Sequence, residues 1–218
     1  MNNIKWTTSP YNENVYKNSP HRIMFMALEP NGDKKHGVTD MGEWLRKEIE
    51  PGMFLKRVKA ITNGILSGLK LDEPMDHIKL VDWKATPGTA KAGPFSVYEE
   101  YVSNNISEVS SYFSGNKYPN YVIFLGSKSR DLFIKFKDEL PLNDKTKAVF
   151  MPQATGAHRI ARGALESAAK NLSLNTLENK SNKFRSINSD FLFYWRYKKS
   201  NWIEHQKDVE DNWEKVTI

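Results

Sequence analysis

The sequence has 218 residues, enough for one domain with a sizeable core, and it contains no cysteine, which excludes disulfides and metal sites held by thiolates. Its formal net charge of +6, from 32 basic and 26 acidic residues, favours a polyanionic partner such as DNA over a cationic substrate. No stretch is apolar over the roughly 18 to 20 residues that a membrane span needs, and residues 1–18 lack the apolar core of a signal peptide, so we expect a cytoplasmic protein.

The first half of the chain predicts two buried strands separated by helices. Residues 1–20 are polar and rich in asparagine, and they predict an irregular arm on the surface. The apolar run at residues 22–28 predicts a buried parallel strand that ends in the loop "EPNGDKKHG". Apolar residues at helical spacing predict two helices between residues 41 and 69. The run "HIKLVDW" at residues 77–83 predicts the second strand, which leads into "KATPGTAKAGP".

The second half continues the alternation of strands and helices. Ser96 is the predicted cap of a helix that extends over "VYEEYVSNNISEVSSYF". Residues 121–126 predict a third strand, followed by the helix "SKSRDLFIKFKDEL", and residues 147–151 predict a fourth, followed by a polar loop and the helix "IARGALESAAKNL". This alternation predicts an α/β fold of three layers, α/β/α, in which helices cover both faces of a central four-stranded, mainly parallel sheet.

The composition divides the chain near residue 172. We expect residues 1–172 to form the α/β domain and residues 173–218 to form an extension that contains "FLFYWRYKKSNW", a segment dense in aromatic and basic side chains. The extension predicts a helix docked on the domain. The alternative is a strip that stacks on bases and contacts phosphates of nucleic acid.

Polar loops follow the predicted strands where a parallel sheet places its ligands, outside the carboxyl ends of the strands. Four segments in this order, "ALEPNG", "IKLVDWKATPG", "YVIFLGSKSRDLF" and "VFMPQATGAHR", resemble the uracil-DNA glycosylase superfamily, nearest to its mismatch-specific and thymine-excising branch. The resemblance covers residues 21–172. It implies an enzyme that rotates a base out of double-stranded DNA and hydrolyses its N-glycosidic bond. We expect this enzyme to be a monomer without a cofactor.

The resemblance also implies roles for residues of the first and last motifs. Glu29, directly before Pro30, matches the position that orients or activates the attacking water. Gln153 matches the residue that assists the departing base, and Ala157 matches the wedge that fills the stack. Because Ala157 is small, we expect His158 or Arg159 to act as the wedge, in a DNA-contacting loop that also includes Thr155 and Gly156. The alternatives are that Glu29 is a solvated loop acid and that Gln153 only closes a turn.

Two departures from the uracil-specific pattern indicate a different base. Asp82 lies where uracil enzymes have an asparagine, and a carboxylate accepts a hydrogen bond from the N4 amino group of cytosine but opposes the O4 atom of uracil. Asn31 lies where those enzymes have an aromatic ring that excludes groups at C5. With Leu28 and Pro30 in the same base-binding group, these residues predict a C5-substituted cytosine, such as the hydroxymethyl or glucosylated cytosine of some phage DNA.

The remaining expectations concern charge, metal and alternative functions. Lys84 and Lys128 lie on the predicted rim, where they would neutralise DNA phosphates. Glu29, Asp33 and His36 share one loop without a recognised ligand spacing, so we expect no metal site. Three alternatives stay open: a uracil or mismatched-thymine glycosylase of base excision repair, a DNA-base-binding protein without turnover, and an enzyme acting on free nucleotides, for which "LGSKSRDLF" is a weak phosphate loop.

Overall fold

Four five-residue strands form one parallel sheet in the order β2-β1-β3-β4 in a computed structural model of the protein. The structure describes residues 4–30, 38–47, 58, 71, 73–88, 93–115, 118–143 and 146–151. Residues 1–49 and 76–147 make up one compact unit, and residues 50–75 and 148–218 make up a second. The predicted boundary at residue 172 and the extension at residues 173–218 lie outside the described residues.

The four strands follow one another as the sequence predicts, and each observed strand lies within the range expected for it. The strands are β1 (Ile23–Ala27), β2 (Ile78–Asp82), β3 (Tyr121–Leu125) and β4 (Lys147–Met151). The helices are α1 (Glu13–Asn18), α2 (Met41–Lys47), α4 (Phe95–Asn104), α5 (Ile106–Ser111) and α6 (Ser127–Phe136), with short 3-10 turns at η3 (Pro74–His77) and η4 (Lys137–Glu139). The α/β fold class and the parallel sheet are therefore confirmed. None of the helices in the described ranges combines the length and apolar character needed to cross a bilayer.

Burial explains why the strands read as continuous apolar runs. Every residue of β1 and β3 is buried, although neighbouring side chains of a strand point to opposite faces of the sheet. Both faces are therefore covered along these central strands, as a layered α/β arrangement requires. The register pairs Ile23 with Ile78 and Ala27 with Asp82, so the carboxyl ends of β1 and β2 lie level with each other.

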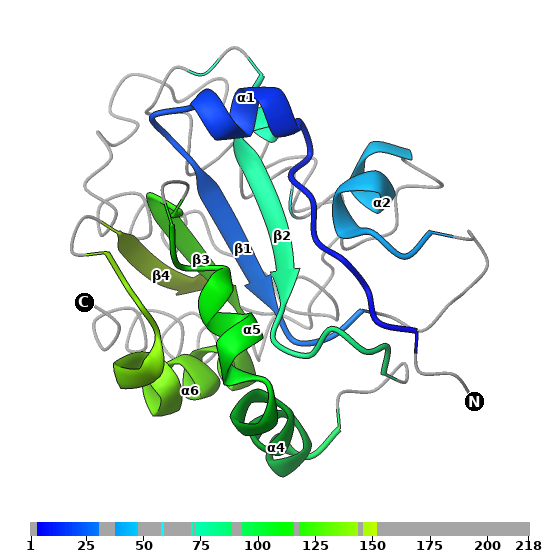
Figure 1. Ribbon diagram of the computed structural model, residues 1–218, viewed down its shortest axis with the longest axis vertical. Helices are drawn as coiled ribbons and strands as arrows, with labels where there is room; N and C mark the ends of the chain where they lie inside the picture. Colours follow the sequence, from blue (N-terminus) through cyan, green and yellow to red (C-terminus); the bar gives the residue numbers. More distant parts are fainter. Residues whose placement is uncertain are drawn as a thin grey trace, which may run out of the picture. The chain divides into compact units, whose positions relative to one another are not determined.

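A strand-to-helix turn anchors α6 to this sheet. Gly126 connects β3 to α6 with a φ of 88°, a left-handed conformation that favours glycine. Inside α6, the hydroxyl of Ser129 accepts a hydrogen bond from Trp83 Nε1 at 2.8 Å and donates one to the carbonyl of Met26 at 2.9 Å. These buried bonds connect α6 with β1 and with the end of β2. Figure 1 shows β1, β2 and β3 side by side, with α4, α5 and α6 gathered close together.

The prediction of one helix capped by Ser96 is wrong in two respects. Helix α4 begins at Phe95, so Ser96 lies within it. The helix is interrupted at Asn105, and α5 begins at the next residue. The Asn105 side chain donates to the carbonyl of Tyr101 at 2.8 Å, and its backbone N–H donates to the carbonyl of Val102. Asparagine ends helices readily because its amide competes for these backbone groups.

The N-terminal segment is also more ordered than an irregular arm. Residues near Pro10 form an antiparallel bridge with Lys79 along the outer edge of β2, and Trp6 donates its backbone N–H to Ala85 at 2.8 Å. Helix α1 then begins after Asn12, whose side chain accepts from the backbone N–H of Val15. Sheet edges present unpaired backbone groups, and covering this edge satisfies part of them. A polar composition therefore concealed an edge-covering segment and a capped helical turn.

Candidate functional site

The ends of β1 and β2 bring two carboxyl groups into the same neighbourhood. Backbone bonds continue beyond the strands, because Trp83 donates its N–H to Ala27 at 3.0 Å and Lys84 donates its N–H to Leu28 at 2.9 Å. Glu29, two residues after β1, therefore lies beside the segment that follows Asp82, the last residue of β2. We call Glu29, Asp82, Lys84 and Tyr98 the carboxylate cluster.

Glu29 is held by two different side chains. Its Oε2 atom forms an ion pair with Lys84 Nζ at 2.7 Å, and its Oε1 atom accepts a hydrogen bond from the Tyr98 hydroxyl at 2.6 Å. The side chains of Lys84 and Glu29 are only 14% and 9% exposed. Since burial weakens screening by water, this ion pair orients the carboxylate more firmly than a surface pair would.

Tyr98 and Lys84 have further contacts that hold them in place. The Tyr98 oxygen accepts from the backbone N–H of Gly93 at 2.8 Å, and Lys84 donates to the carbonyl of Thr86 at 3.0 Å. Burial, followed by the hydrogen bond to Glu29, raises the pKa of Tyr98 to about 12. The phenol is therefore neutral at physiological pH and donates a hydrogen bond to Glu29.

Gly88 makes room for this arrangement. A Cβ atom at residue 88 would lie 2.0 Å from Glu29 Cδ and within 2.2 Å of both carboxylate oxygens. The backbone N–H of Gly88 also donates to the carbonyl of Pro30 at 3.1 Å, so the two loops approach closely. Any larger residue at position 88 must displace a carboxylate that Lys84 and Tyr98 hold.

Asp82 has the opposite environment. Its side chain is buried, with the residue 3% exposed, and neither carboxyl oxygen has a hydrogen-bond partner among the described residues. Burial, followed by the negative charge of Glu29, raises the pKa of Asp82 to about 8, although the positive charge of Lys84 partly opposes both. Asp82 is therefore mostly protonated at neutral pH, when Glu29 is paired with a cation. Burying an acid without a hydrogen-bond partner costs free energy of folding. Such groups are rare in native proteins, so this one calls for an explanation such as a functional role.

The structure brings together five of the residues that the sequence predicted for the site, and it changes the role of one of them. Leu28, Glu29 and Pro30 follow β1 and lie beside the end of β2, which includes Asp82 and Lys84. Lys84 was expected on the rim as a phosphate contact, but its ammonium is bound to Glu29 and to a backbone carbonyl. The carboxylate of Glu29, which is also shielded from water, explains why the charge of Lys84 is used internally.

The other predicted residues are less informative about the site. Lys128 donates a hydrogen bond to the carbonyl of Gly93, and its ammonium lies 5.8 Å from the centre of the Tyr98 ring. It therefore lies near Tyr98 of the carboxylate cluster but does not contact Glu29 in the described residues. The other predicted site residues lie outside the described residues; they are Asn31, Gln153, Thr155, Gly156, Ala157, His158 and Arg159. Asp33 and His36 also lie outside the described residues. Within the described ranges, no group of three or more histidine or acidic residues is arranged to hold a metal ion.

Sequence reasoning missed Tyr98 and Gly88. Tyr98 occupies an inward position of an amphipathic helix, where an aromatic residue is typical of the core, and nothing in the pattern distinguishes its hydroxyl. Gly88 belongs to "TPG", a segment that reads as an ordinary turn. A glycine in a loop opposite a predicted catalytic acid was the only signal available, because glycine permits a close approach.

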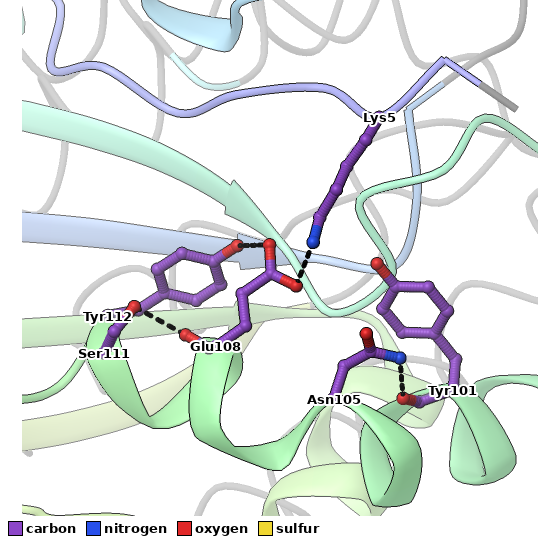
Figure 2. Close-up of polar contacts among 6 residues, drawn as sticks. All are labelled: Lys5, Tyr101, Asn105, Glu108, Ser111 and Tyr112. Carbon is purple, nitrogen blue, oxygen red and sulfur yellow. Dashed lines mark hydrogen bonds and ion pairs between the residues drawn. The ribbon is translucent and has the colours of Figure 1, made fainter.

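A second cluster in the same unit also joins a glutamate to a lysine and a tyrosine. Glu108 on α5 forms an ion pair with Lys5 at 2.5 Å and accepts a hydrogen bond from the Tyr112 hydroxyl at 3.4 Å, as Figure 2 shows. We call Lys5, Glu108 and Tyr112 the surface cluster, because the Lys5 and Glu108 side chains are 51% and 28% exposed. It provides an internal reference for the carboxylate cluster.

Comparison with known protein families yields no matching family model, and comparison with curated proteins yields no match.

Proposed function

We propose that the protein is a monofunctional DNA glycosylase, which hydrolyses the N-glycosidic bond of a flipped-out base and leaves an abasic site. The observation that supports this most directly is the pair of neighbouring carboxyl groups in contrasting environments. Glu29 is ion-paired with Lys84, whereas Asp82 is buried without a partner and has a raised pKa. Neighbouring carboxyl groups that differ in protonation are typical of sites that cleave glycosidic bonds.

Glu29 would stabilise the charge that develops on the sugar. As the bond between C1′ and the base breaks, its electron pair leaves with the base and positive charge grows on the deoxyribose. A carboxylate fixed by Lys84 and Tyr98 can face this charge without reorganisation, and can align a water molecule whose oxygen bonds to C1′. The water's proton passes to the departing base or to solvent. Because a cation and a phenol both bind Glu29, it acts mainly by orientation and charge rather than as a strong base.

Asp82 would read the 4-position of the everted base. As a carboxylate it can only accept a hydrogen bond, which suits the N4 amino group of cytosine, and the carbonyl oxygen of its neutral form can still accept from that group. With Asn31 in place of a ring, the substrate is a C5-substituted cytosine of phage DNA, on which the protein acts as a monomer in the cytoplasm. The hydrogen-bond capacity that Asp82 leaves unused within the described residues supports a role in recognition.

A second candidate function is excision of uracil or mismatched thymine. The neutral form of Asp82, favoured by a pKa of about 8, could donate its proton to the O4 atom of those bases. A third is recognition of a modified base without turnover, which is favoured because Lys84 offsets the charge of Glu29.

One experiment separates these candidates. Purified protein is incubated with matched duplexes that carry cytosine, hydroxymethylcytosine, glucosylated hydroxymethylcytosine, uracil or a G·T mismatch, and with phage and host genomic DNA. Released bases are then identified by mass spectrometry. We expect release of the modified cytosine alone, and abasic sites in the same duplex. Release of uracil or thymine would favour the repair enzyme, whereas tight binding without release of any base would favour the binding protein and contradict glycosylase activity.

A further inference from the structure

A cavity of about 270 Å³ lies beside the outer edge of the sheet, at Lys79 of β2. The N-terminal segment, Lys79 and the region after α5 line it, including Thr8, Tyr16 and Tyr112. All of these residues belong to the same compact unit. The carboxylate cluster contributes no side chain to the cavity lining.

Lys79 is the unusual residue of this cavity. Its ammonium lies 5.5 Å from the centre of the Tyr112 ring, and it makes no hydrogen bond or ion pair with another described residue. Burial lowers its pKa, despite the opposing influence of Asp40 and Glu13. An ammonium has three donors, and withdrawing them from water without partners is unfavourable.

The neighbouring acids are already engaged elsewhere. Asp40 accepts hydrogen bonds from the hydroxyls of Thr7 and Ser9 and from a backbone N–H. Glu13, which also lines the cavity, forms an ion pair with Lys17 one helical turn away. Neither acid forms a direct ion pair with Lys79, so the positive charge in the cavity is only partly offset.

The cavity offers two further donors. Within the described residues, the hydroxyls of Thr8 and Tyr16 make no hydrogen bond. Burial raises the pKa of Tyr16, so its phenol keeps its proton and can donate a hydrogen bond. An ammonium and two hydroxyls around one small cavity match a tetrahedral oxyanion, which accepts several hydrogen bonds and carries negative charge.

We propose that this cavity binds the phosphate group of a phosphate ester, with Lys79 neutralising its charge and Thr8 and Tyr16 donating hydrogen bonds. The volume of about 270 Å³ is enough for a phosphate with a small organic group. The phosphate could belong to a free small molecule or to a DNA strand. This site does not depend on the proposed glycosylase chemistry.

The test compares thermal unfolding in inorganic phosphate with unfolding in potassium chloride at equal ionic strength. We expect a saturable rise of Tm with phosphate, which is lost in Lys79→Met, a change that keeps most of the aliphatic volume. Lys17→Met is the matched control, because Lys17 also lines the cavity but is exposed and paired with Glu13. An equal rise with chloride, or an unchanged response in Lys79→Met, would overturn the proposal.

Tyr16→Phe keeps the test decisive if Lys79→Met fails to fold. It removes only one donor, so we expect phosphate affinity to fall about tenfold, as is typical when a hydrogen bond to a charged group is lost. An unchanged affinity would contradict the proposed donor.

NMR of the Lys79 side chain in phosphate-free buffer distinguishes the two sources of phosphate. A shift caused by inorganic phosphate but not by a DNA duplex would assign the site to a small molecule. A shift caused by the duplex and reversed by phosphate would assign it to the nucleic acid. No shift with either would refute the site.

Discussion

The carboxylate cluster and the surface cluster both contain a glutamate bound to a lysine and a tyrosine, yet their environments differ. In each, a glutamate lies between a lysine and a tyrosine, but Glu29 is 9% exposed and Glu108 is 28% exposed. Glu29 also lies close enough to a buried acid, Asp82, for its negative charge to help raise the pKa of that acid. The difference shows that a Glu-Lys-Tyr contact becomes chemically distinctive through burial and through a second carboxyl group, not through its residue types.

The largest contrast is expected on activity. Glu29→Gln removes the charge that faces the sugar while preserving shape, so we expect kcat/KM for base release to fall by about 10³-fold. Glu108→Gln is the matched control, because it removes the same charge from the surface cluster, and it should leave activity unchanged. A fully active Glu29→Gln enzyme would remove Glu29 from the chemistry, and equal losses in both variants would indicate a general effect of charge.

The two lysines are expected to differ in stability. Lys84→Met leaves Glu29 buried without its cation, and we expect the free energy of unfolding to fall by about 3 kcal/mol. Lys5→Met breaks an exposed pair, and we expect a loss below about 1 kcal/mol. Urea unfolding at neutral pH measures both. If the two losses are equal, burial does not distinguish the clusters.

The buried acid should make stability depend on pH. The pKa of Asp82 is raised from its ordinary 3.8 to about 8, so between these values the folded protein holds a proton that the unfolded chain releases. The contribution of Asp82 to stability is therefore present at acidic pH and is lost as pH rises towards 8, by up to about 1.4 kcal/mol per pH unit.

Asp82→Asn should abolish this component of the pH dependence, because an amide does not titrate in this range. Urea unfolding of the variant and of the unsubstituted protein at a series of pH values compares the two slopes. Glu108→Gln, in the surface cluster, should keep the component of the slope that Asp82 contributes. The same slope in Asp82→Asn would show that Asp82 is ionised in the folded protein.

The smallest contrast concerns the two phenols. Tyr98→Phe removes a 2.6 Å hydrogen bond to a buried carboxylate, and we expect a stability loss of about 2 kcal/mol. Tyr112→Phe removes a 3.4 Å contact, and we expect a loss of about 0.5 kcal/mol. Thermal or urea unfolding would measure the difference, and a larger loss in Tyr112→Phe would reverse the ranking of the two clusters.

Parts of the fold followed directly from local pattern. The strands were predictable because runs such as Ile23–Ala27 are long enough for a strand, wholly apolar and followed by turn residues. The break at Asn105 was not predictable from the periodicity, because apolar spacing continues across it while the side-chain amide ends the helix. The structure of the N-terminal segment was also not predictable from local pattern, because it depends on pairing with the edge of β2, which is distant in sequence.

The candidate site divides in the same way. Glu29 and Asp82 could be named from strand ends and polar loops, and their proximity follows from parallel strands in register. The ion pair with Lys84 could not be foreseen, because a lysine in a loop is usually solvated and only burial directs it inward. Tyr98 could not be foreseen because it is 69 residues away from Glu29 along the chain.

The sequence by itself determined the order of the strands, the α/β class and the acids placed at strand ends, because these depend on hydrophobic period and on neighbouring residues. Only the tertiary structure decided which cation binds Glu29, how deeply Asp82 is buried and which phenol donates to the carboxylate. Those properties depend on how far segments distant in sequence exclude water from the site. The pKa of a carboxyl group and the strength of its ion pairs depend more on this exclusion than on whether the residue is Asp or Glu.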